Sequence, residues 1–472
     1  MRKFLFCLFF CVGLCTSITA QQLVLKKGTI VDSLKINDTI SENFGLYLPK
    51  KFETNKKWPV VFLFDAKGKG KQVLLMFAQA AEKHGYILAA SNSVYDSLPM
   101  SENILRSSRM MNTVLTLLPI DSRRIYTSGF AEGAKFASVL PVVIKNIEGV
   151  LSIGAPLANT DVLTVKNPFH YIGVVDVDDY NLIEMQVNEK LLNGLRFSNE
   201  LFVYEQGSEP SPLKYIYTAL EVFSLNAMAK SLVDKDTLFI NTSFNENFNL
   251  ITSLISQKKL LQADDLISDM MTIYRVHKDI GELKSLQKDL RKDKLYKTMK
   301  RSESNYIFKE SFLREDYDYA IYEDLATYNF NNLGWWNYQM QELNKNSSSG
   351  NPFESQMGKR LIGFINHLVE SNSNELKNEK VLDEEGLNFL WMLQTITNPK
   401  NYDSYIKVIS YNSKKEDFGT ALFYLEELLK AGYTDKKELY NIKHTALLRI
   451  TPEFNQVVEK YLKDARYQII EQ

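Results

Sequence analysis

Residues 124–135, which read RIYTSGFAEGAK, decide the fold of this chain. The aromatic and β-branched run Arg124–Thr127 is typical of a strand, and the residues after the turn have a helical pattern. Gly129 and Gly133 lie between the two, and their spacing permits a sharp, closely packed turn. We therefore predict a strand, a tight turn and a helix in this segment.

Short apolar runs alternate with helical patterns on both sides of this turn. The run Pro59–Phe64 is continuously apolar, as in a strand that is buried on both faces. The expected strands are Phe44–Leu48, Pro59–Phe64, Tyr86–Ala90, Arg124–Thr127, Val150–Ile153, Tyr171–Val175 and Leu201–Tyr204, with helices near 71–84, 101–118, 132–145, 181–195 and 212–231. This alternation predicts an α/β fold, a mostly parallel sheet with helices on both faces.

From about Asp234 onward the pattern is helical throughout, which predicts an all-α C-terminal region. The polar segment Asn344–Pro352 reads as a linker within it. The expected parts are a signal peptide at 1–20, a sheet domain at 21–232 and helical regions at 233–343 and 353–472. Residues 418–433 resemble one tetratricopeptide-type helix, and a generic helical bundle is the alternative.

The N-terminus has the layout of a secretory signal peptide. Arg2 and Lys3 precede the apolar run Phe4–Leu14, which is too short to span a bilayer, and cleavage is expected after Ala20. This predicts an exported protein, in the periplasm or secreted to the medium. The alternatives are an uncleaved anchor and a lipid anchor on Cys15.

Composition narrows the possible chemistry. All 3 cysteines lie within residues 1–20, so the mature chain has no disulfide, thiol nucleophile or cysteine metal site. The 56 Lys and Arg residues balance 57 Asp and Glu residues, which argues against nucleic acid or an anionic membrane as the main partner. No further membrane span is expected. We predict no metal and no cofactor, and a ligand or protein partner outside the cytoplasm.

Four segments together carry a resemblance to a known family: Leu46–Pro49, Pro59–Phe64, Ala81–Leu88 and the turn at 124–135. They resemble, in this order, the exported esterase and depolymerase branch of the α/β-hydrolase superfamily, of the polyhydroxybutyrate depolymerase and feruloyl esterase types. The resemblance covers Phe44 to about Ser231, under half of the chain. It implies an α/β-hydrolase sheet and a serine esterase site.

The resemblance also locates that site, and two of its three catalytic positions hold unsuitable residues. The nucleophile elbow of the family reads Gly-x-Ser-x-Gly, and here Ala131 takes the place of the serine. The acid position corresponds to Asp179 in the run 176–181, and the histidine position to Ser208. A methyl group cannot attack a carbonyl, and none of the 5 histidines lies in the loop after the last predicted strand. No intact catalytic residue is therefore expected.

The oxyanion loop of the family corresponds to residues 65–70. Its glycines are present, and Asp65 stands where many relatives have histidine. The residues expected to line the cleft are Asp65, Ala66, Gly68, Phe130 and Glu132.

Other residues have both a functional and a structural interpretation. Ser128 is either a displaced nucleophile or the end of a buried strand, and Glu132 either a base or a helix-capping carboxylate. Asp176, Asp178 and Asp179 either bind Ca²⁺ or form a polar loop. Lys67 and Lys69 either bind an anion or have no binding role. Trp335, Trp336 and Tyr338 form either an aromatic binding surface or part of the helical core.

Two functions follow from the sequence. The first is a catalytically inactive pseudo-esterase that acts as a binding or scaffold module. The alternative is a hydrolase of esters or acylated carbohydrates that uses non-standard groups such as Asp65 or Glu132. A third, weaker interpretation gives the function to the helical part alone.

Overall fold

The computed structural model describes residues 25–207 and 212–467. The expected signal peptide and Ser208 therefore lie outside the described residues. Within those two ranges, no helix combines the length and the apolar character needed to cross a membrane.

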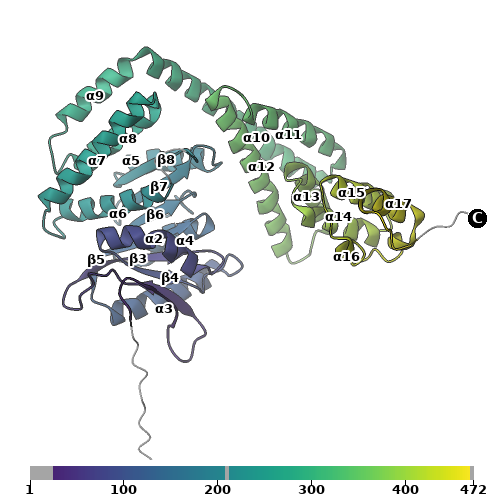
Figure 1. Ribbon diagram of the computed structural model, residues 1–472, viewed down its shortest axis with the longest axis horizontal. Coiled ribbons are helices and arrows are strands. Elements are labelled where there is room, and N and C mark those ends of the chain that lie inside the picture. Colours follow the sequence, from purple (N-terminus) through teal and green to yellow (C-terminus); the bar gives the residue numbers. More distant parts are fainter. Residues whose placement is uncertain (1–24, 208–211, 468–472) are drawn as a thin grey trace, which may run out of the picture. The chain divides into compact units, whose positions relative to one another are not determined.

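The core of the N-terminal part is an eight-stranded sheet in the order β1-β2-β4-β3-β5-β6-β7-β8 (Figure 1). Strand β2 is antiparallel to both of its neighbours, whereas β3 is parallel to β4 and β5, and β5 is parallel to β6. The strands are β1 Ile30–Lys35, β2 Asn43–Tyr47, β3 Trp58–Phe64, β4 Ile87–Ser91, β5 Ile120–Phe130, β6 Ile147–Ile153, β7 His170–Asp176 and β8 Asn199–Tyr204. The expected α/β class with a mostly parallel sheet is confirmed.

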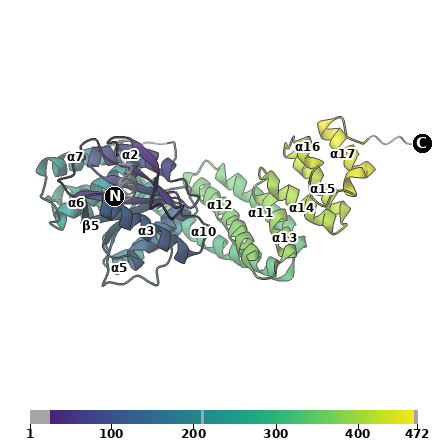
Figure 2. The same cartoon turned by 90° about the horizontal axis from the view of Figure 1, so that it is seen from below.

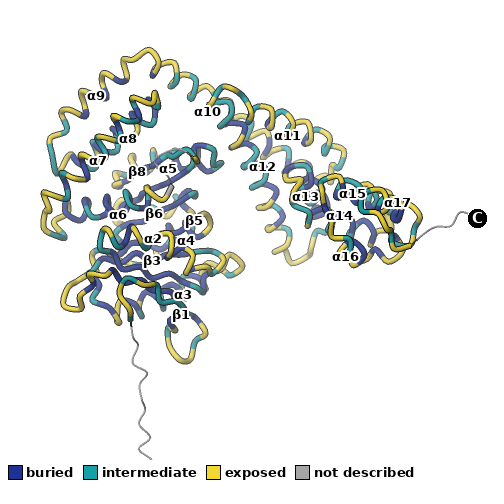
Figure 3. Tube along the Cα trace, viewed as in Figure 1, coloured by how far each residue is buried: buried dark blue, intermediate teal, exposed yellow. Residues whose placement is uncertain are grey.

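Helices cover both faces of this sheet. They are α2 Gly70–His84, α3 Met100–Leu117, α4 Glu132–Val143, α5 Leu182–Gly194 and α6 Pro212–Ala229. Helices α3 and α4 share one hydrophobic cluster with β2, β3 and β4, in which the Phe136 ring meets Phe64 edge-on. On the other face α6 contacts α2, and its Phe223 ring stacks on Tyr126 of β5 at 4.3 Å. The central strands are buried along their length (Figure 3).

The rest of the chain is helical, as expected. Helices α10 to α13 lie side by side around a core that includes Trp336 and Leu361 (Figure 2). The helices are α7 Thr237–Ser256, α8 Leu260–Tyr274, α9 Gly281–Lys292, α10 Lys294–Thr327, α11 Leu333–Ser347, α12 Pro352–Asn378, α13 Glu384–Thr397, α14 Tyr402–Lys414, α15 Phe418–Lys430, α16 Lys436–Leu439 and α17 Pro452–Leu462. The segment expected as a linker contains the end of α11 and the first residue of α12, whose N-terminus the Asn351 side chain caps.

The chain divides into two compact units. The first consists of the described residues up to Gly173 together with Leu192–Glu200 and Pro212–Asp236, and the second of the remaining described residues. The division therefore passes through β7 and β8, so that the loop after β7 belongs to the same unit as the C-terminal helices.

Candidate functional site

The turn after β5 has the geometry of a nucleophile elbow. Ala131 follows the last residue of the strand with φ 47° and ψ −121°, a conformation that residues with a Cβ rarely adopt. Its N–H donates to the Ile153 carbonyl at 2.9 Å, and its own carbonyl accepts from Ala134 N–H at 2.9 Å as α4 begins. The expected strand–turn–helix is thus present, and its apex carries an exposed methyl group.

The two glycines of the elbow are required by close packing. A Cβ at Gly129 would lie 2.5 Å from the Gly133 carbonyl carbon, and a Cβ at Gly133 only 2.4 Å from the Phe64 carbonyl oxygen. A Cβ at Gly133 would also lie 3.1 Å from the Cα of Asp65. The elbow therefore contacts the start of the expected oxyanion loop directly.

Asp65 organises that loop through the backbone. Its Oδ1 accepts hydrogen bonds from Lys67 N–H at 2.8 Å and from Lys69 N–H at 3.0 Å. These bonds turn the chain after β3 and lead into α2, so the Asp65 carboxylate already has a structural role. The lysine side chains themselves are exposed.

A second loop, residues 92–99 after β4, is hydrogen-bonded to the loop at residues 65–70. Asp96 N–H donates to the Ala66 carbonyl at 2.8 Å, and Lys67 pairs with Tyr95 in a short antiparallel bridge. Gly68 has φ +68°, and a Cβ there would lie 2.6 Å from the Tyr95 ring. Gly68 is therefore needed both for its backbone conformation and for the approach of Tyr95.

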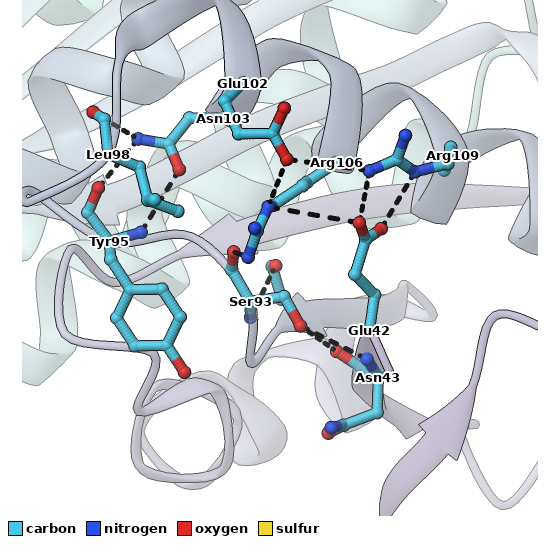
Figure 4. Close-up of polar contacts among 10 residues, drawn as sticks. Glu42, Asn43, Ser93, Tyr95, Leu98, Glu102, Asn103, Arg106 and Arg109 are labelled. Atoms are coloured by element: carbon cyan, nitrogen blue, oxygen red, sulfur yellow. Dashed lines mark hydrogen bonds and ion pairs between the residues drawn. The ribbon is translucent and has the colours of Figure 1, made fainter. Parts of the chain in front are cut away.

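Figure 4 shows what holds Tyr95 in place. Asn103 of α3 clamps its backbone: Nδ2 donates to the Tyr95 carbonyl at 2.7 Å, and Oδ1 accepts from its N–H at 3.2 Å. One turn further along α3, Arg106 donates to the Ser93 carbonyl at 3.2 Å and to Glu102 at 2.8 Å. Arg109 binds Glu42 through two nitrogens, with Nε 3.0 Å from Oε2. Sequence patterns do not reveal this network, because its members are up to 67 residues apart.

Two backbone N–H groups, one at the elbow and one in the loop after β3, have no hydrogen-bond acceptor among the described residues. Neither Glu132 N–H, the first of α4, nor Ala66 N–H, directly after Asp65, donates a hydrogen bond to another described residue. Backbone donors after the nucleophile position and in the loop after β3 form the oxyanion hole of hydrolases. These two N–H groups are therefore the candidate donors for an oxyanion or carbonyl group beside the Ala131 methyl group.

The loop after β7, residues 176–181, belongs to the second unit. Asp179 Oδ1 accepts from Asn181 N–H at 2.8 Å, and Asp176 Oδ1 accepts from Asp178 N–H at 2.8 Å. Burial raises the pKa of both Asp176 and Asp179 above the ordinary value for aspartate. No group of metal-ligating side chains occurs within the described ranges, so the structure gives no support to the Ca²⁺ interpretation.

Side chains from α10 and α12 hydrogen-bond to the backbone of this loop. Arg360 Nη1 donates to the Val177 carbonyl at 2.7 Å, and Arg314 Nη2 donates to the Tyr180 carbonyl at 2.8 Å. Both guanidinium groups also bind the fully buried carboxylate of Glu310, at 2.7 Å and 2.8 Å.

Two further contacts join the loop after β7 to α12. Lys359 pairs with Asp178 at 2.7 Å, and the His367 ring stacks on Tyr180 at 4.8 Å. The sequence reasoning missed these residues, since nothing in a helical pattern identifies a distant partner.

His84 and His170, which lie in α2 and β7, both have structural surroundings. His170 begins β7, is 1% exposed, and pairs through Nε2 with the buried Glu200. Burial lowers the pKa of His84 to about 4, and its ring meets Tyr217 edge-on. Ser128 is fully buried within β5, which contradicts a role as displaced nucleophile.

The tryptophan pair divides between core and surface. Trp336 is fully buried and donates to Asp324 at 2.8 Å, as expected for core packing, and Trp335 packs at the edge of the same cluster. Tyr338 is 58% exposed.

A cavity of about 210 Å³ lies in the second unit, lined by α5, the end of β8, α8, α10 and α12. Leu261, Tyr306 and Phe353 supply apolar wall. The amides of Gln186, Gln262 and Gln356, which also line it, make no hydrogen bond within the described chain.

Asp265 is one of three carboxylates that line this cavity, together with Glu205 and Glu303. Its side chain reaches solvent there, yet protein surrounds it on most sides, and this burial raises its pKa to about 7, while Lys300 acts in the opposite direction. The cavity thus combines apolar wall, free amides and a carboxyl group that titrates near neutrality.

No family model matches this sequence, and no curated protein does. Among solved structures, one similar fold is an esterase from Rhizomucor miehei, with 11% identity, 42% of this chain and 85% of that chain covered, and a TM-score of 0.36. An acetyl ester-xyloside bifunctional hydrolase from Caldicellulosiruptor lactoaceticus shares 12% identity over 43% of this chain and 97% of its own, with a TM-score of 0.34. A feruloyl esterase module from Clostridium thermocellum shares 11% sequence identity with this chain, over 41% of this chain and 86% of its own, with a TM-score of 0.35. Each of these similarities covers less than half of this chain.

Proposed function

We propose that this chain is an exported α/β-hydrolase-like protein that has lost catalysis and acts as a binding or scaffold module. The observation that carries the proposal is the elbow at Ala131, with φ 47° and ψ −121°. Such a backbone conformation costs about 1–3 kcal/mol and is held only where the surrounding structure enforces it. The elbow keeps this strain and its open N–H groups while presenting a methyl group that cannot act as a nucleophile.

The surroundings of His170 and His84 support the same proposal. A serine hydrolase needs an imidazole between its nucleophile and its acid. Ser208 stands at the position where the resemblance expects that imidazole. His170 is committed to Glu200, and His84 is held with a pKa of about 4 beside Tyr217.

The binding role is supported by the cavity beside Asp265. Its charged groups are largely paired with each other: Lys259 with Glu205 at 3.2 Å, and Lys300 with Glu303 at 2.7 Å. What remains for a ligand is apolar wall, the glutamine amides and the Asp265 carboxyl group. Such a lining suits a small, uncharged ligand that has both hydrogen-bonding groups and an apolar face.

The test is labelling of residues 21–472 with a fluorophosphonate probe, together with turnover of p-nitrophenyl acetate. The probe reacts with a serine that a base activates. We expect neither labelling nor turnover in the natural chain, and none in Ala131→Ser, because the histidine is missing as well. Stoichiometric labelling of the natural chain would overturn the proposal.

The alternative is an esterase that uses Asp65 or Glu132. It requires turnover that Asp65→Asn or Glu132→Gln abolishes. In the structure Asp65 is bound to loop amides, and Glu132 is exposed and pairs with Lys135 at 2.8 Å, so both carboxylates have structural partners. Turnover without probe labelling, lost in one of these variants, would favour this alternative.

Export is the remaining part of the proposal. It is supported by the basic, apolar and small-residue segments of residues 1–20. The mass of the protein purified after expression in an exporting host is expected to correspond to a chain that starts at Gln21. A mass that includes the apolar run would contradict cleavage.

A further inference from the structure

Helix α10 carries four exposed aromatic side chains on one face. Phe308 is 66% exposed, Phe312 52%, Tyr319 65% and Tyr322 67%. Their spacings of four, seven and three residues place them on one side of an α-helix, and we call them the aromatic stripe. Figure 3 shows α10 with an exposed side along its length.

The opposite face of α10 is packed within the second unit. Glu310, Tyr317 and Ile321 are buried there, and α10 contacts α12. The aromatic stripe is therefore not needed for the fold of this helix. Exposed apolar side chains that are grouped in this way usually mark an interaction surface.

The charges beside the stripe are separated along the helix. The exposed basic residues come first, and the exposed acidic residues come last. The basic group is Lys294, Lys297, Arg301 and Lys309, and the acidic group is Glu315, Asp316, Asp318 and Glu323. None of these eight side chains makes an ion pair within the described ranges. A helix of this kind is complementary to a second copy of itself that runs in the opposite direction.

We propose that two copies of this chain associate through antiparallel α10 helices, with a two-fold axis at Phe312. The axis follows from the charges: Arg301 lies 11 positions before Phe312 and Glu323 lies 11 positions after it (312 − 301 = 323 − 312). Two-fold symmetry then sets Arg301 of each copy level with Glu323 of the other. Lys309 is likewise level with Glu315 and beside Asp316, and the two Phe312 rings meet.

The charges also favour an antiparallel second copy of this chain over other partners. A parallel arrangement would oppose like charges along the whole helix, which is unfavourable. A membrane surface rich in anionic lipid would be repelled by the acidic half, where Tyr319 and Tyr322 lie. The antiparallel pair instead sets unlike charges level with each other at Arg301 and Glu323 and at Lys309 and Glu315.

The absence of cysteine from residues 21–472 allows a direct test of the axis. A residue on a two-fold axis meets its own copy, so Phe312→Cys is expected to form an intermolecular disulfide under mild oxidation. Phe308 lies four residues away, so its two copies would be separated by about 12 Å along the helices, since each residue rises 1.5 Å. This exceeds the reach of a disulfide, so Phe308→Cys is the matched control and is expected to stay uncrosslinked.

Sedimentation equilibrium tests the charges. We expect residues 21–472 to dimerise, Arg301→Glu to raise the dissociation constant at least tenfold, and Arg301→Glu with Glu323→Arg to restore it. Phe312→Glu is expected to give a monomer with an unchanged circular dichroism spectrum, because its side chain is exposed. A monomeric natural chain at 100 μM, an unaffected dimer in Phe312→Glu, or crosslinking at Phe308 in preference to Phe312 would overturn the proposal.

Discussion

The Glu310 carboxylate and the Arg360 guanidinium form a buried ion pair, with 2.7 Å between Oε2 and Nη2 and side chains that are 0% and 4% exposed. Because Arg314 binds the other carboxylate oxygen, two guanidinium groups share one buried carboxylate. Both arginines then reach backbone carbonyls of the loop after β7. This carboxylate therefore determines the conformation of a loop more than 100 residues away in sequence.

Glu310→Gln is expected to destabilise the second unit strongly. The substitution leaves buried guanidinium groups without a counter-charge, which typically costs about 3–5 kcal/mol. Urea unfolding followed by circular dichroism measures the change. Glu370→Gln, at an exposed position of α12 in the same unit, is the control and is expected to change the unfolding free energy by less than about 0.5 kcal/mol. Equal effects of the two variants would show that the buried pair contributes nothing of its own.

Ala131→Gly is expected to stabilise the first unit. Glycine adopts φ 47°, ψ −121° without the steric strain that alanine bears, and the relief of about 1–3 kcal/mol exceeds the entropy cost of glycine, roughly 0.5–1 kcal/mol. Ala134→Gly is the control three residues on: it lies inside α4 and is buried, so it should destabilise by at least about 1 kcal/mol. Thermal unfolding of both variants checks the contrast. A lower melting temperature for Ala131→Gly would disprove strain at the elbow.

Asn103→Ala is expected to loosen the loop at residues 65–70. The side chain of Asn103 hydrogen-bonds to both backbone groups of Tyr95 (Figure 4). Tyr95 in turn packs on Gly68. Its loss should cost about 1–3 kcal/mol, because a buried donor and acceptor are left unpaired. Hydrogen exchange of the amides at 65–70 should become faster. Asn112→Ala, at an exposed position of the same helix, should leave that exchange unchanged.

Asp265 predicts a pH dependence of stability with a definite sign. Its pKa rises from 3.8 to about 7 on folding, so between about pH 4 and pH 7 the native state binds more protons than the unfolded state. Stability is therefore expected to fall as pH rises through that window and to level off above pH 7.

Asp265→Asn should flatten this dependence, so the difference in melting temperature between pH 5 and pH 8 should shrink. Asp234→Asn, outside the cavity and outside α10, is the matched control and should leave the difference as it is. An unaltered difference in Asp265→Asn would assign the pH dependence to other groups.

The sequence predicted those elements whose signals are local. The elbow at 129–133 follows from two glycines between a strand and a helix, and the sheet follows from apolar runs such as β3. Strand β1, Ile30–Lys35, was not predicted: its burial is partial and a bulge interrupts its pairing with β2, so its sequence lacks a clear apolar run. The contact of Arg360 with Val177 was out of reach because it joins residues 183 apart.

The passage of the unit boundary through β7 and β8 has a practical consequence for dissecting this protein. Removing everything after Asp236 looks natural from the sequence, since the strands have ended by then. It would, however, take away the arginines, the lysine and the histidine that hold the loop after β7, and leave Val177 and Tyr180 with their carbonyls uncapped. The sheet is thus finished by the helices that follow it, and the two halves of the gene are best expressed together.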